Sequence, residues 1–180
     1  MSIPDNPQQF THLNEWLAWL EQAHSIHNIE LGLERAQKVA RRLDLIHLDA
    51  QVITVAGTNG KGSTVAAIEA LAVSHKVSVG CYTSPHLIHF NERMKLNGES
   101  ASDELIIESF RAVYEAKGDT RLTYFEFTTL VALWLFKQQQ LDLIVLVIVA
   151  GLIEVDAAVA QFLNHAELLF VHRQQYCYLL

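Results

Sequence analysis

The strongest chemical signal in the chain is a loop at residues 52–64, with the sequence VITVAGTNGKGST. A short β-branched run ends at a glycine-rich turn, and a lysine and two hydroxyls follow at the start of a helical pattern. Glycines let backbone N–H groups approach an anion, a helix N-terminus favours negative charge, and a lysine reaches the terminal phosphates. The order therefore predicts a nucleotide phosphate site formed by Gly57, Thr58, Asn59, Gly60, Lys61, Gly62, Ser63 and Thr64.

The spacing within this loop differs from that of the usual P-loop. Gly62 separates Lys61 from Ser63, and Val55 and Ala56 stand where the first glycine of the usual motif would fall. The alternative is a glycine-rich strand-to-helix turn that binds nothing. Because the lysine, the hydroxyls and both flanking elements are present, the pattern favours nucleotide binding.

The elements that must position this loop alternate between strand and helix patterns. Residues 143–149 are almost purely aliphatic, which is typical of a strand buried on both faces of a parallel sheet. We expect an α/β fold with a doubly wound, mostly parallel sheet and ligands at the carboxyl ends of its strands. The expected helices cover residues 10–23, 33–45, 61–73, 103–116 (capped by Ser102), 123–138 and 156–163. The expected strands cover residues 52–56, 77–82, 94–96, 143–149 and 168–171.

The composition narrows the class of protein. Hydrophobic residues make up 51% and charged residues 18%, so the chain is globular rather than disordered. A net charge of −7 argues against nucleic acid as the main partner. Cys81 and Cys177 lack metal-site spacing and are expected to be reduced thiols. Residues 1–7 do not form a signal peptide and the apolar run at 143–152 is too short to span a bilayer, so we expect a cytoplasmic location without membrane partners.

The loop variant GTNGKGS resembles that of the ATP-dependent amide ligases that include the Mur enzymes. Further motifs are similar to those of the folylpolyglutamate synthase and dihydrofolate synthase family. They follow the family's order and spacing from about residue 16 to about residue 146, where the resemblance stops. These motifs are IELGLER at 29–35, YTSPHL at 82–87, NER at 91–93 and LTYFEF at 122–127.

The resemblance implies ATP and Mg²⁺ as cofactors. Lys61 would be the catalytic lysine, and Ser84 would help to hold the magnesium ion, for which a hydroxyl is a reasonable hard-oxygen ligand. An ordinary turn serine is the alternative. His86 and His89 could suggest a zinc site, but their motif contains no third ligand, and we reject that interpretation.

The resemblance also implies a pterin site. A flat heteroaromatic ring needs an aromatic wall and a few polar groups at its edge. Without the family context, Tyr124 and Phe125 would be assigned to the core at a helix start. The NER motif at 91–93 is expected near the substrate. The segments that resemble the pterin enclosure are Ile29, Glu30 and Leu31, and Thr123, Tyr124, Phe125 and Glu126.

The implied reaction is amide formation driven by ATP, with L-glutamate and either dihydropteroate or a folate as substrates. The substrate carboxylate would attack the γ-phosphate, giving an acyl phosphate and ADP, and the amine of glutamate would then displace phosphate. Lys61 and magnesium would stabilise the charge that develops on the transferring phosphoryl group. The pattern leaves the choice between dihydropteroate and folate open.

The chain departs from the family pattern after residue 146. Val147 occupies the position of a magnesium-binding glutamate, and a valine cannot ligate a metal. Glu154 follows seven residues later and cannot be assumed to replace it. The family's second metal-binding histidine and its C-terminal glutamate-binding domain are missing as well. We therefore expect residues 1–180 to form a single, partial N-terminal ATP-binding domain of a truncated or frame-disrupted product, with a stand-alone variant as the other possibility.

Two functional classes remain open for this sequence. The first is a folate ligase by descent, and the alternative is a catalytically inactive remnant that binds nucleotide or pterin. A different P-loop enzyme, such as a kinase, is disfavoured because Gly62 follows Lys61 and because the pterin-type motifs have no place in it. Since family strands would be missing beyond residue 171, apolar surface should be exposed, and we expect self-association.

Overall fold

The computed structural model describes residues 7–23, 34–57, 59–147, 166–171 and 177–179. The chain divides into two compact units. Unit 1 contains residues 1–45 and 102–135, and unit 2 contains residues 46–101 and 136–180. Each unit has its own set of buried apolar side chains.

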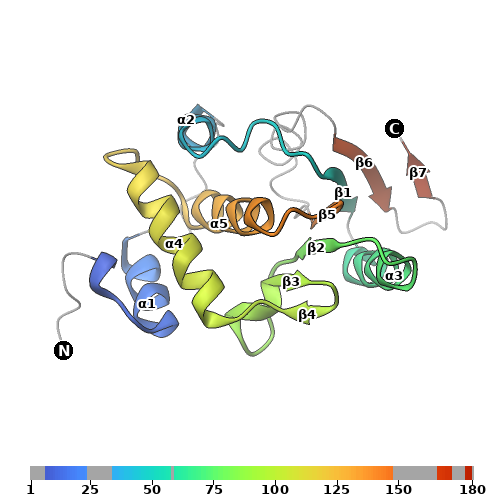
Figure 1. The fold of residues 1–180 in the computed structure, drawn as a ribbon, viewed down its shortest axis with the longest axis horizontal. Coiled ribbons are helices and arrows are strands. Elements are labelled where there is room, and N and C mark those ends of the chain that lie inside the picture. The colour runs from blue at the N-terminus through green and yellow to red at the C-terminus, as the bar shows by residue number, and fades with distance from the viewer. Residues whose placement is uncertain (1–6, 24–33, 58, 148–165, 172–176, 180) are drawn as a thin grey trace. The chain divides into compact units, whose positions relative to one another are not determined.

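The sheet of unit 2 has the strand order β4-β3-β2-β5-β1-β6-β7 among the described residues (Figure 1). The four central strands β2, β5, β1 and β6 pair in parallel, whereas β3 and β4 at one edge and β7 at the other pair antiparallel. This arrangement confirms the predicted mostly parallel α/β sheet. The strands are β1 (Gln51–Gly57), β2 (Val79–Tyr82), β3 (Met94–Leu96), β4 (Glu99–Ser100), β5 (Leu143–Val147), β6 (Ala166–Val171) and β7 (Cys177–Leu179).

The register brings the carboxyl ends of three parallel strands to one edge. Val55 of β1 pairs with Val147 of β5, and Tyr82 of β2 pairs with Leu146 of β5. The loops that follow β1 and β2 therefore emerge at the same edge, on either side of the end of β5. That is where parallel α/β sheets bind their ligands.

Helix α3 (Lys61–Ser74) begins four residues after the end of β1 and packs on this sheet. Its Val65 and Ala72 join a buried cluster that includes Val55 and Val145, which are both 0% exposed. The aliphatic composition of β5 follows from this burial, because a strand in the middle of a covered sheet exposes neither face to water.

Unit 1 is helical and has an aromatic core. Its helices are α1 (Leu13–Ala23), α2 (Glu34–Arg42), α4 (Asp103–Lys117) and α5 (Tyr124–Gln138), the last of which belongs to this unit as far as Leu135. The fully buried Trp16 stacks on Phe110 at 5.4 Å between ring centroids, and Phe110 stacks on Phe127 at the same distance. Ser102 caps α4, as predicted, by accepting a hydrogen bond from the Leu105 N–H.

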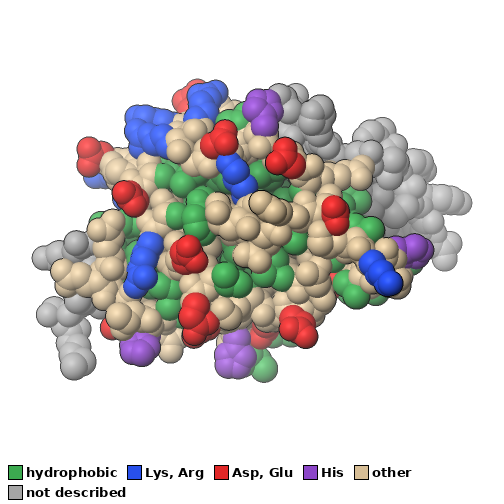
Figure 2. Space-filling view, in the orientation of Figure 1, with side chains coloured by type: hydrophobic (Ala, Val, Ile, Leu, Met, Phe, Trp, Pro, Cys, Tyr) green, Lys and Arg blue, Asp and Glu red, His purple; other side chains and the backbone are tan. Residues whose placement is uncertain are grey.

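The described elements agree with the predicted ones apart from small shifts of their ends. The predicted helix at 156–163 lies outside the described residues. The sequence patterns missed the short strands β4 and β7 and the 3₁₀ helices Pro7–Gln9 and Phe90–Arg93. No helix in the described part of the chain is long and apolar enough to cross a membrane. Figure 2 shows acidic side chains spread over the visible face, in keeping with the net charge of −7.

Candidate nucleotide-binding site

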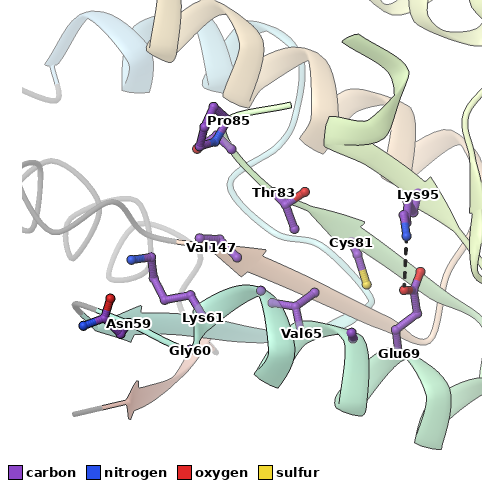
Figure 3. Close-up of a pocket in the computed structure, with 13 residues that line it drawn as sticks. Asn59, Gly60, Lys61, Val65, Glu69, Cys81, Thr83, Pro85, Lys95 and Val147 are labelled. Carbon is purple, nitrogen blue, oxygen red and sulfur yellow. Dashed lines mark ion pairs between the residues drawn. The ribbon is translucent and has the colours of Figure 1, made fainter. Parts of the chain in front are cut away.

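A cavity of about 450 Å³ lies at the carboxyl edge of the sheet in unit 2 (Figure 3). Its volume falls in the range of small-molecule sites. The loop after β1, the first turns of α3, the ends of β2 and β5, and β3 contribute its walls. The lining residues are Asn59, Gly60, Lys61, Gly62, Val65, Ala66, Glu69, Cys81, Thr83, Ser84, Pro85, Lys95 and Val147.

The entry of the chain into α3 leaves the start of this helix open to a ligand. Gly60 precedes the helix with a φ of +79°, a left-handed conformation that glycine adopts without steric cost. No side chain of the described residues caps this helix, so none of them accepts a hydrogen bond from its first N–H groups. A phosphate can accept hydrogen bonds from such groups and is favoured by the helix dipole.

The predicted catalytic lysine is held across the loop. The Nζ of the half-buried Lys61 donates to the carbonyl of Gly57 at 2.7 Å. The Thr64 hydroxyl donates to the carbonyl of Gly60 at 3.0 Å. Of the predicted phosphate-binding residues, Asn59, Gly60, Lys61 and Gly62 line the cavity. Gly57 at the end of β1 and Ser63 and Thr64 on α3 lie outside its lining, and Thr58 lies outside the described residues.

Gly62 lies inside α3, where a glycine costs roughly 1 kcal/mol relative to alanine. A Cβ added to Gly62 would have no heavy atom within 4 Å, so packing within the described residues does not require glycine here. The residue lines the cavity, and the missing side chain leaves the helix backbone accessible from that side. This is the feature expected where a ligand approaches the backbone closely.

Ser84 lines the same cavity just after β2. Its Oγ is buried and has no hydrogen-bond partner among the described residues. A buried hydroxyl of this kind is unusual and indicates an absent partner, such as a water or an ion. Val147 also faces the cavity, 5% exposed, and its side chain offers no donor atom to a metal. Among the described residues, the ends of β2 and β5 therefore bring the hydroxyls of Thr83 and Ser84 to the cavity and no carboxylate.

The far wall of the cavity contains residues that the sequence analysis missed, namely Glu69, Cys81 and Lys95. Glu69 and Lys95 form an ion pair with 3.9 Å between Oε2 and Nζ. The sequence could have indicated Glu69, because it follows Lys61 by eight residues on the same predicted helix and so lies on a nearby part of the helix surface. Lys95 lines the cavity because β3 pairs with β2, and no local sequence pattern predicts this position.

The turn that follows Ser84 is ordered by the predicted NER motif. The Glu92 carboxylate accepts hydrogen bonds from the backbone N–H groups of residues 87–89 at 2.7–3.0 Å. The bond from His89 and those from the two preceding residues lower the pKa of Glu92 to about 2. Arg93 Nε donates to His86 Nδ1 at 2.8 Å. Substrate contact by this motif stays a prediction.

The predicted pterin residues at 123–126 begin α5 in unit 1. The Thr123 N–H donates to Glu126 Oε2 at 2.6 Å, and the Glu126 N–H donates to Thr123 Oγ1 at 3.2 Å, which is a capping box. Glu126 also pairs with Arg35 at 3.3 Å. Tyr124 and Phe125 are half-buried. Ile29, Glu30 and Leu31 lie outside the described residues, so the pterin site stays a prediction.

Known proteins resemble this chain over most of its described length, although no protein-family model matches it. The dihydrofolate synthase/folylpolyglutamate synthase of Escherichia coli K12 is 44% identical over 151 residues, which are 84% of this chain and 36% of that protein. The solved structure of E. coli FolC in complex with DHPP and ADP has a TM-score of 0.76 and 45% identity, covering 81% of this chain and 35% of that one. The solved structure of the bifunctional folylpolyglutamate synthase/dihydrofolate synthase of Yersinia pestis complexed with AMPPNP and Mn ion has a TM-score of 0.76 and 46% identity. The match covers 82% of this chain and 36% of that one.

These similarities confirm the resemblance and the α/β fold that the sequence motifs predict. The chain spans about a third of the length of the curated relatives it matches.

Proposed function

We propose that this chain carries the ATP-binding part of a dihydrofolate synthase/folylpolyglutamate synthase, which adds L-glutamate to dihydropteroate or to folates. The observation that carries the proposal is the cavity of unit 2, where Lys61, the uncapped start of α3 and the unpartnered Ser84 hydroxyl share one space. The similarity to synthases over more than four-fifths of the chain supports the same conclusion. That residues 1–180 form one partial ATP-binding domain is part of this proposal.

In the proposed reaction, a carboxylate of the pterin substrate attacks the γ-phosphate of ATP. The P–O bond to ADP breaks, and an acyl phosphate forms. The amine of glutamate then attacks the acyl carbon and releases phosphate. Lys61 and the first N–H groups of α3 would hold the phosphates and stabilise charge on the transferring group, since fixed donors cost no reorganisation during the reaction.

A divalent cation fits this cavity in part. Ser84 would hold it through Oγ, whereas Val147 cannot, and Glu69 is paired with Lys95. Magnesium is often bound by one or two carboxylates together with phosphates and water, so phosphates and water would have to supply most ligands here. When bound, the ion would neutralise charge on the phosphates.

The pterin part of the proposal rests on the segments 29–31 and 123–126. The half-buried aromatic rings of Tyr124 and Phe125 could form one wall for a flat heterocycle. Glu126 has structural partners in Thr123 and Arg35, so its role would be to hold the start of α5 in place as much as to contact the ring.

The alternative function is an inactive remnant that binds nucleotide or pterin. One observation supports it, namely the apolar Val147 in the cavity. The synthases to which the chain is similar favour the ligase.

We also propose self-association, and cytoplasm as the compartment. Leu71, Leu87 and Ile88 are 61%, 91% and 78% exposed, and large apolar side chains at such exposure favour association when they lie together. Light scattering would detect dimers or larger species, and a sharp monomer peak across concentrations would contradict the proposal.

The test of ATP binding is calorimetry on the whole chain with Mg²⁺. We expect Lys61→Gln to weaken ATP binding by about 1.5–3 kcal/mol, because it removes a charge-assisted contact. The matched control is Lys76→Gln, which removes the same charge from an exposed position outside the cavity lining. Equal ATP affinities of wild type and Lys61→Gln would refute the proposal.

A second assay separates the ligase from the remnant. ADP release that requires both dihydropteroate and glutamate, and that is lost in Lys61→Gln, identifies a ligase. ATP binding without such turnover identifies the remnant, for which the apolar Val147 in the cavity is the supporting observation.

A further inference from the structure

At the end of the cavity farther along α3, Glu69 and Lys95 form an ion pair whose polar atoms are not all hydrogen-bonded among the described residues. Glu69 on α3 is 8% exposed, and Lys95 reaches it from β3 (Figure 3). The Glu69 Oε2 lies 3.9 Å from the Lys95 Nζ. The Glu69 Oε1 is buried and has no hydrogen-bond partner among the described residues.

The contact between these two groups is loose. Its 3.9 Å separation exceeds the roughly 2.7–2.9 Å of a charge-assisted hydrogen bond. The Lys95 side chain is 39% exposed, and its ammonium carries three donors on a flexible stem. A competing anion can therefore reach this ammonium without breaking a tight pair.

The third member of this group, Cys81, is directly paired with Lys95 in the register of β2 and β3. Burial, and to a lesser degree the charge of Glu69, raise the pKa of the Cys81 thiol to about 12. The thiol is therefore neutral at physiological pH and adds no charge to this group. In this group only the ammonium of Lys95 can attract an anion, and the Glu69 carboxylate opposes that attraction.

The proposed phosphate end and this pair lie at different points along α3 in the same cavity (Figure 3). Lys61 and Glu69 are eight residues apart on α3, which is roughly 12 Å along the helix axis. The two ammonium groups, of Lys61 and Lys95, thus line one cavity of about 450 Å³. A ligand with more than one anionic group can engage both of them.

We propose that Lys95 is a second anion-binding group of this cavity and that Glu69 is its partner when no ligand is bound. An oxyanion would displace Glu69 from Lys95 while Lys61 and the start of α3 hold a phosphate. The oxyanion is either a phosphate of the nucleotide or a carboxylate of the acyl substrate. The inference rests on the proposed function in that it assumes phosphate binding at Lys61.

The test is calorimetry of the whole chain with inorganic tripolyphosphate and, separately, with glutarate as a carboxylate probe. Lys95→Gln should weaken binding roughly three- to tenfold, because a cation is lost from the cavity. Glu69→Gln should strengthen it roughly two- to fivefold, because Lys95 is released and a repelling charge is removed. Lys76→Gln, which changes the same charge outside the cavity lining, should leave binding unchanged.

The opposite signs separate this role from a structural one. If the pair only fastened α3 to β3, both substitutions would weaken binding together with stability, and that result would overturn the inference. An effect confined to tripolyphosphate assigns Lys95 to a phosphate, and one confined to glutarate assigns it to a carboxylate. Binding that depends on Lys61 but is unchanged in Lys95→Gln overturns this inference alone, whereas absence of binding by the wild type overturns the proposed function as well.

Discussion

Replacing Gly62 by alanine should stabilise the folded protein and weaken ATP binding. Gly62 is the second residue of α3, and an added Cβ would have no heavy atom within 4 Å. Alanine loses less backbone conformational entropy on folding than glycine does, so the free energy of unfolding should rise by roughly 0.5–1 kcal/mol. For a chain of this size such a gain corresponds to an increase in Tm of about 1–4 °C.

The same methyl group should obstruct a phosphate. Gly62 lines the cavity at the uncapped start of α3, where a phosphate oxygen must come within roughly 2.7–2.9 Å of a backbone N–H. Loss of one charge-assisted hydrogen bond costs about 1.5–3 kcal/mol. We therefore expect the Kd for ATP to increase roughly 10- to 150-fold.

Urea denaturation and calorimetry with ATP measure the two effects on one preparation. The matched control is Ala67→Gly, the reverse substitution at an exposed site of the same helix outside the cavity lining. It should lower the free energy of unfolding by roughly 1 kcal/mol and leave ATP affinity unchanged. The reasoning is refuted if Gly62→Ala binds ATP as tightly as the wild type, or if it unfolds at a lower urea concentration.

Three further substitutions test other parts of the structure. Val147→Glu buries a charge at a 5% exposed position and should lower the free energy of unfolding by about 1–3 kcal/mol. It should also make ATP affinity in calorimetry depend more on Mg²⁺, and an unchanged dependence would argue against the metal position. Because the pKa of Glu92 is lowered from 4.5 to about 2, its hydrogen bonds should still be intact at pH 4.5 and should be lost as the pH falls through about 2. NMR should show the amide shifts of residues 87–89 moving with a midpoint near that pH in the wild type, and Glu92→Gln should lack this transition. Gly80→Ala places a Cβ 2.6 Å from Leu141 Cδ1 and should cost about 1–3 kcal/mol in urea denaturation, so a variant of wild-type stability would disprove the close packing.

The sequence by itself predicted the strand, turn and helix around the proposed phosphate loop, and the central strands of the sheet, because these elements have local signatures. A β-branched run followed by glycines and a lysine requires a strand, a turn and a helix in that order. The uninterrupted aliphatic run of β5 requires burial on both faces. The helix cap at Ser102 was equally readable, since a cap depends on residues within one turn.

The edges of the sheet could not be predicted in the same way. β4 and β7 contain two and three residues at the two edges of the sheet, and they form by antiparallel pairing with β3 and β6, which no local pattern of side chains reveals. The 3₁₀ helix Phe90–Arg93 depends on the Glu92 carboxylate binding three N–H groups of the preceding turn. That arrangement is visible only once the turn has formed.

Tertiary structure alone decided which side chains share the cavity. Val147 faces it because the register of β5 against β1 ends both strands at one edge, and Lys95 enters it because β3 pairs antiparallel with β2 opposite Cys81. Hydrogen bonds between strands distant in sequence set such registers, and a shift of one residue would turn each side chain to the other face of the sheet. The proposed phosphate loop is therefore a local feature that the sequence predicts, whereas the opposite wall of the cavity depends on strand pairing.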